Sequence, residues 1–88
     1  GVIFLSGDRH MGEISQLDNA GKTITEVTSS GMTHFRHDVS REKNSLRVGE
    51  VFAGLNFGTL EIDWASKKIH IAIRDTEGAP VRKAEVPF

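Results

Sequence analysis

Apolar and polar residues alternate along two neighbouring stretches near the end of the chain, and this period constrains the fold more than any other feature. The apolar positions are Leu60, Ile62 and Trp64 in the first stretch and Ile69, Ile71 and Ile73 in the second. Successive side chains of a strand point to opposite faces, so a period of two predicts strands with one face toward a core. Residues 65–68 join the two stretches. We therefore predict a β-hairpin here, directed inward on one face.

Three further strands are predicted from local composition. Glu13–Leu17 and Thr23–Ser29 flank Asp18-Asn19-Ala20-Gly21, which is typical of a hairpin turn. The apolar residues of these two segments differ in parity, so we expect either a bulge or two buried faces. Val81–Val86 lies between two prolines, which favours a strand at the edge of a sheet.

The chain opens with the apolar run Val2–Leu5. Four successive apolar residues predict a strand covered on both faces, as in the centre of a layered α/β or sandwich core. A natural amino terminus rarely lies inside such a strand, so we expect Gly1 to be a cut point and an earlier part of the domain to be missing. No convincing helix is predicted in the chain to cover one face of this strand.

Length, charge and cysteine content restrict the remaining possibilities. The 88 residues suffice for one small domain at most, and residues 31–54 are polar, which favours a solvated loop over a helix. The absence of cysteine excludes disulfides and thiolate metal sites. With 11 basic and 12 acidic residues the net charge is −1, which gives no electrostatic indication of nucleic acid or an anionic membrane as a partner. No apolar run approaches the ~18 residues of a membrane span.

Ser6-Gly7-Asp8-Arg9-His10 is the stretch most suggestive of chemistry. Here an apolar strand ends at a glycine turn, and open α/β sheets bind ligands at such strand ends. The carboxylate of Asp8 and the imidazole of His10 are ligands for zinc, iron or manganese, on one metal ion or on two neighbouring ones. The alternative for Asp8 is a turn-capping role. In an extended strand the side chain of Arg9 points away from those of Asp8 and His10, which favours a salt bridge on the far side. The alternative is that Arg9 turns inward and binds a phosphate oxygen.

The other possible donors are Glu13 and three histidines. His34 follows a glycine at another strand end and is either a hydrogen-bonded structural residue or a functional one. His37 lies among charges in the polar loop, and His70 falls on the polar face of a predicted strand, so solvent exposure is expected for both. Asp8 and His10 are too few for catalysis, since catalytic zinc has three protein ligands and a water.

Several stretches together resemble the carboxy-terminal part of alkaline phosphatase D-like metallophosphoesterases. They are Leu5–His10, Gly12–Ile14, Glu26–His34, Asn56–Gly58 and Glu61–Trp64. Their order and spacing fit, and the resemblance covers nearly the whole chain. The superfamily motifs Asp-x-His, Gly-Asp-x-x-Asp and Gly-Asn-His are absent here and belong upstream.

The resemblance implies a four-layered α/β core with two metal ions that activate a bridging water against a phosphate ester. The last ligand motif is usually Gly-His-x-His, and His10 matches its second histidine. Asp8 stands in the place of the first, which leaves its metal role open. Glu13, Ser30, Thr33 and His34 match recurrent positions without an assigned chemistry. The implied metals are divalent or trivalent ions of iron, zinc, manganese or calcium, and the implied location is outside the cytoplasm, periplasmic or extracellular.

We therefore predict that residues 1–88 are the carboxy-terminal segment of a metallophosphatase domain, a β-rich fragment of a four-layered α/β fold with mostly antiparallel strands and little helix. Its partners would be the missing amino-terminal part and a phosphate-ester substrate, and the isolated segment would be inactive. The alternative is a non-catalytic β-sandwich accessory domain that binds a partner or a sugar.

Overall fold

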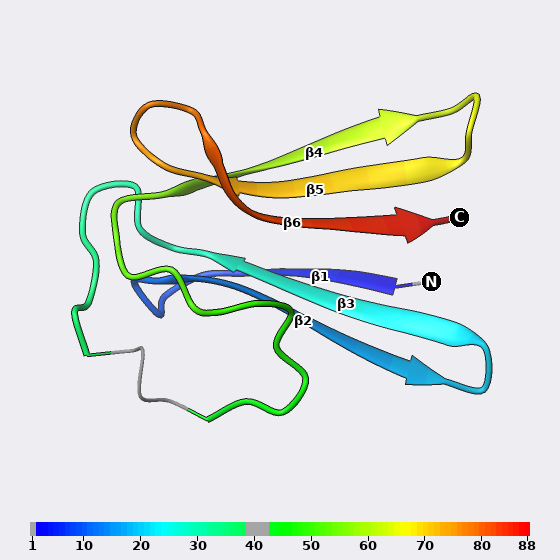
Figure 1. The fold of residues 1–88 in the computed structure, drawn as a ribbon, viewed down its shortest axis with the longest axis horizontal. Coiled ribbons are helices and arrows are strands. Elements are labelled where there is room, and N and C mark those ends of the chain that lie inside the picture. Colours follow the sequence, from blue (N-terminus) through cyan, green and yellow to red (C-terminus); the bar gives the residue numbers. More distant parts are fainter. Residues whose placement is uncertain (1, 39–42) are drawn as a thin grey trace.

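The computed structural model describes residues 2–38 and 43–88, which form six strands in two stacked sheets (Figure 1). The first sheet has the order β1-β3-β2, with β1 at Val2–Ser6, β2 at Gly12–Asn19 and β3 at Lys22–Ser29. The second has the order β4-β5-β6, with β4 at Phe57–Asp63, β5 at Lys68–Arg74 and β6 at Pro80–Pro87. The predicted β-rich, mostly antiparallel structure is confirmed. The described residues contain no helix, and so no helical layer of the expected α/β fold.

The β2–β3 hairpin forms where the turn composition predicted it. Ala20 and Gly21 form the turn with φ of 53° and 78°, the left-handed pair that a two-residue hairpin loop requires. The register runs without a bulge from Gly12↔Ser29 to Asn19↔Lys22. The expected bulge is therefore absent, and only one of the two faces expected to be buried is buried. Ile14 pairs with Val27 in the core, whereas Leu17 pairs with Ile24 on the outer face, where both are partly exposed.

β1 is an edge strand, and the prediction that both of its faces are covered is wrong for the described chain. It pairs only with β3, in parallel, and no described segment lies along its other edge. Val2, Phe4 and Leu5 are each at least 50% exposed, and only Ile3 packs against the core. The apolar run is a strand as predicted, but this chain does not supply the layers that would cover it.

The β4–β5 hairpin is confirmed as an element, while its inward face is only half covered. In the turn, the backbone N–H groups of Ala65 and Ser66 donate to Asp63 Oδ1 at 3.1 Å each, and the bond from Ser66 is the main reason that the pKa of Asp63 is lowered. The apolar row on β5 is well covered, since Ile71 and Ile73 are buried. The facing row on β4 is not: Leu60, Ile62 and Trp64 are 43%, 47% and 73% exposed. β6 is an edge strand, as predicted.

The two sheets enclose one main core and are closed on one side only. The buried residues of this core are Ile14, Val27, Ile71, Ile73 and Val86. β2 packs on β6, and β3 packs on β4. On the opposite side the edges of β1 and β4 are both unpaired in the described chain, and a groove of about 280 Å³ between them is lined by apolar residues that include Leu5, Met32 and Leu60. We call this the open side of the sandwich.

The described parts of the polar region 31–54 form a loop, as predicted, with isolated bridges in place of regular strands. The segment runs along the outer edge of β2, where Phe52 exchanges two backbone hydrogen bonds with Gly12 and the N–H of Val48 donates to the carbonyl of Ile14. This loop therefore protects the edge of β2. Residues 39–42, and the cut point expected at Gly1, lie outside the described residues.

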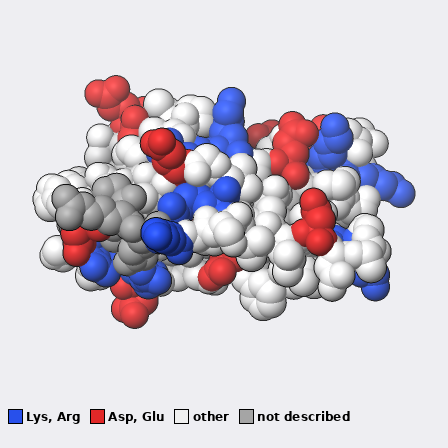
Figure 2. Space-filling view, turned by 60° about the horizontal axis from the view of Figure 1, so that its bottom comes forward, with Lys and Arg blue, Asp and Glu red and all other residues white. Residues whose placement is uncertain are grey.

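The surface carries charges of both signs. On the face shown in Figure 2, basic and acidic side chains are intermingled without a broad area of one sign. Among residues 2–38 and 43–88 there is no helix with the length and apolarity of a membrane span.

Candidate functional site

Parallel pairing brings the carboxyl ends of β1 and β3 to the same edge of the first sheet. Ser6 lies opposite Thr28 in the register, so the loop of residues 7–11 and the segment of residues 30–36 leave the sheet side by side. Two backbone hydrogen bonds join them: the N–H of Ser30 donates to the carbonyl of Met11 at 3.0 Å, and the N–H of Arg36 donates to that of His10 at 2.9 Å. This is the kind of strand-end position at which α/β sheets hold ligands.

The backbone of the first loop is strained at both predicted metal ligands. Asp8 has φ of 70° and His10 has φ of 53°, in the left-handed region that residues other than glycine rarely adopt. Such conformations cost about 1 to 3 kcal/mol each and persist where surrounding contacts hold them, often at functional sites. Asp8, Arg9 and His10 are all exposed, so their polar groups are accessible from solvent.

His34, which the sequence indicated as a possible functional residue, is 24 positions away from His10 along the chain but lies next to it in the structure. The ring centroids are 6.2 Å apart and the rings are tilted by 30°. A solvent-open depression of about 250 Å³ lies beside them, and it is lined by His10, Ser29, Ser30, Met32, Thr33 and His34. The Oγ1 atom of Thr33 and the Nδ1 atom of His34 share a hydrogen bond of 2.8 Å. Three of the residues that the resemblance singled out, Ser30, Thr33 and His34, are thus gathered around His10. We call this depression the histidine pocket.

The donor chemistry of the histidine pocket fits a metal ion, but the ligand set within the described chain is incomplete. Imidazole is a good ligand for zinc and iron. No group of three or more His, Asp or Glu side chains close enough to hold a metal occurs within residues 2–38 and 43–88. Asp8 does not line the pocket that His10 and His34 share. Further ligands would therefore have to come from another part of a complete site.

Glu13 lies away from the histidine pocket and anchors the long loop. Its carboxylate is nearly buried, and Oε1 accepts hydrogen bonds from Arg47 Nε at 2.5 Å and from Asn44 Nδ2 at 3.1 Å. Asn44 Nδ2 also donates to Ser15 Oγ at 2.7 Å. In this structure the contacts of Glu13 are those of a buried ion pair that fastens the loop to β2.

Asn56 is a supporting residue that the sequence analysis did not single out as a site candidate. It is buried, and its side chain accepts a hydrogen bond from Ser29 Oγ at 2.8 Å and donates one to the carbonyl of Gly54 at 2.8 Å. Its N–H donates to the carbonyl of Gly31 at 2.9 Å. A Cβ atom at Gly31 would overlap the amide of Asn56, so glycine is required there. The sequence did contain an indication of this role, because Asn56 is the first residue of Asn56–Gly58, one of the stretches that resemble the metallophosphoesterases.

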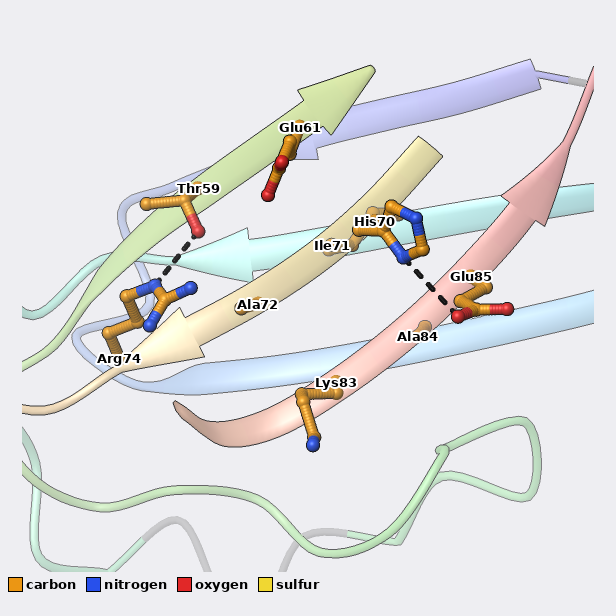
Figure 3. A pocket seen from close by; sticks show the side chains of 9 residues that line it. All are labelled: Thr59, Glu61, His70, Ile71, Ala72, Arg74, Lys83, Ala84 and Glu85. Atoms are coloured by element: carbon orange, nitrogen blue, oxygen red, sulfur yellow. Dashed lines mark hydrogen bonds and ion pairs between the residues drawn. The ribbon is translucent and has the colours of Figure 1, made fainter. Parts of the chain in front are cut away.

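The two remaining histidines lie outside the histidine pocket. His37 is exposed and contacts the ring of Phe35 edge-on, with 4.6 Å between centroids. His70 lies on the polar face of the second sheet, as predicted, with Nδ1 at 3.3 Å from Glu85 Oε1 and 41% of its side chain exposed. Figure 3 shows it in a shallow groove where Arg74 donates to Thr59 Oγ1. Within this groove Arg74 contacts Thr59, and His70 contacts Glu85.

Comparison of the chain with protein-family models, with curated proteins and with solved structures gave no match.

Proposed function

We propose that this chain is the carboxy-terminal segment of a metal-dependent phosphoric ester hydrolase of the alkaline phosphatase D-like kind. The observation that carries the proposal is the position of His10. This residue, which the motif Gly7-Asp8-Arg9-His10 indicates as a ligand by resemblance, lies in the loop after β1, beside His34 in the segment that follows the parallel strand β3.

The chemistry of ester hydrolysis supports this role for the loop of residues 7–11. Metal ions, when bound, lower the pKa of a water and offset the negative charge of the phosphoryl group. The imidazole of His10 and the carboxylate of Asp8 would hold such ions. Both are exposed on one short loop whose backbone is held in an unusual conformation, which suits side chains that must be aimed at a ligand. The substrate class is a phosphate monoester or diester.

The open side of the sandwich supports the proposal that the active domain is larger than this segment. β1 and β4 present unpaired edges on the same side in the described chain, and Leu5 and Leu60 are exposed at the groove between them. Burying one such side chain stabilises a protein by about 1.5 to 3 kcal/mol, so leaving several exposed removes much of a small domain's stability. Further strands and layers of the same domain would cover them and would bring the remaining metal ligands.

Replacing His10 in the complete natural chain that contains these residues tests the proposal. His10→Ala should reduce the bound metal and lower the rate of aryl phosphate ester hydrolysis by at least about tenfold, since a direct ligand is lost. His70→Ala is the matched control, because His70 lies on the other sheet in contact with Glu85, and it should leave metal content and rate unchanged. Full metal content and full rate in His10→Ala would refute the proposal.

The rival function, a non-catalytic β-sandwich that binds a partner, is favoured by one observation. The described chain is itself two stacked three-stranded sheets with a shared core. In that case the complete chain would hydrolyse no phosphate ester, and neither histidine substitution would alter a metal content.

A further inference from the structure

We infer that His34 is a metal ligand beside His10, so that the histidine pocket is one half of a metal site formed by two strand ends. The inference rests on the proposed function. It adds a metal ligand, His34, that is not part of the motif Gly7-Asp8-Arg9-His10.

The contact between Thr33 and His34 leaves one ring nitrogen available. The 2.8 Å hydrogen bond engages Nδ1 of His34. When Nδ1 carries the proton and donates it to Thr33 Oγ1, the lone pair of Nε2 is free to bind a metal ion. Histidine ligands of metals generally have their second ring nitrogen fixed by such a partner, which sets the tautomer and the orientation of the ring.

The two imidazoles are held relative to each other by the backbone. The N–H of Arg36 donates to the carbonyl of His10 itself, and the N–H of Ser30 donates to the carbonyl of Met11. His34 thus lies in a segment that is fastened to the first loop on both sides. The close fit of Gly31 against the buried amide of Asn56 fixes the start of this segment. A pair of histidines that met by chance on flexible loops would lack this support.

The two rings lie side by side without stacking. At 6.2 Å between centroids the imidazoles do not stack against each other, and the depression beside them is open to solvent. Ser30 and Thr33 line the same depression.

Binding of Co²⁺ to the complete natural chain tests the inference, with affinity measured by chelator competition and coordination followed by visible absorption. His34→Ala should weaken Co²⁺ binding by at least about tenfold and change the spectrum, since a ligand is lost. Thr33→Val removes only the partner of Nδ1 and should weaken binding by roughly 10- to 100-fold, the usual effect of losing such a partner. Thr33 is exposed, so this variant remains informative if His34→Ala fails to fold.

His37→Ala is the matched control, because it makes the same substitution at an exposed histidine close by in the sequence, and it should bind Co²⁺ like the wild type. Wild-type affinity and spectrum in both His34→Ala and Thr33→Val would overturn the inference. If His10→Ala alone loses Co²⁺ and ester hydrolysis, the proposed function stands and only the role of His34 falls. If the unaltered chain neither binds Co²⁺ nor hydrolyses an aryl phosphate ester, the proposed function falls as well.

Discussion

Glu13 and Arg47 show how one pair of side chains fixes a long loop on a small sheet. Their side chains are only 10% and 14% exposed, and the guanidinium of Arg47 donates directly to the carboxylate. Removing one partner of such a pair leaves the other as an uncompensated buried charge, whereas replacing both with neutral groups costs much less. The loop that this pair holds also carries Asn56, which supports the segment before His34.

Arg47→Met is expected to destabilise the protein by about 3 to 5 kcal/mol, because the buried carboxyl group of Glu13 then loses the partner of its ion pair. The double variant Glu13→Gln/Arg47→Met should recover a large part of this loss. Urea unfolding of the single and double variants measures both values. An equal loss in the two variants would show that packing of the Arg47 stem, and not the charge on Glu13, is the cause.

At the scale of the elements, the strands differ in how many neighbours they have. β3 and β5 are central strands with a partner on each side, and β2 is protected by the loop that follows its outer edge. β1 has one partner, and its apolar side chains are largely exposed. The two hairpins are therefore the better-supported units of the described chain, and β1 is the least covered strand.

Hydrogen exchange of the 88-residue chain should show the contrast directly. The amides of Ile3–Leu5 are expected to exchange faster than those of Ile69–Ile73, because an exposed edge strand opens at a lower free energy than a central one. Exchange followed by mass spectrometry or NMR gives the two rates. Equal protection of both segments in a monomer would mean that the chain is a self-sufficient domain, and the binding-module function would then be the better proposal.

Residues 2–38 and 43–88 form a flat body of 36 × 27 × 18 Å, and exposed apolar side chains gather on two of its surfaces. One is the open side of the sandwich, and the other is the outer face of the first sheet. The apolar residues on that outer face and beside it are Val2, Phe4, Leu17, Ile24 and Leu46. Large exposed apolar areas mark interaction surfaces in native proteins and cause self-association when they are left uncovered. Two such surfaces on so small a body agree with a segment of a larger domain.

The isolated 88-residue chain is accordingly expected to lack phosphatase activity and to self-associate. The described residues contain no complete metal-binding group, so added metal should not restore turnover. An assay with an aryl phosphate and added Zn²⁺, Mn²⁺ or Fe²⁺, together with light scattering, measures both properties. Turnover clearly above that of a denatured control would contradict the proposed incompleteness.

The sequence by itself determined the elements that depend on neighbours along the chain. The period of two in residues 69–73 and the Ala20-Gly21 turn specify the hairpins, because side-chain alternation and turn conformation are local properties. The same is true of the polar loop and of the edge strand between the two prolines. The candidates Asp8, His10 and His34 were also found locally, as polar residues at the ends of apolar or β segments.

Only the tertiary structure decided which of these residues meet. The parallel pairing of β1 with β3 joins segments that are distant in sequence, and it is this pairing that places His10 beside His34. The partner of Glu13 likewise lies in a loop without a regular pattern. The exposure of Leu60 and Ile62 depends on which surface packs against β4. An alternating pattern shows that one face of a strand is apolar. It does not show that the same chain contains the layer that covers this face.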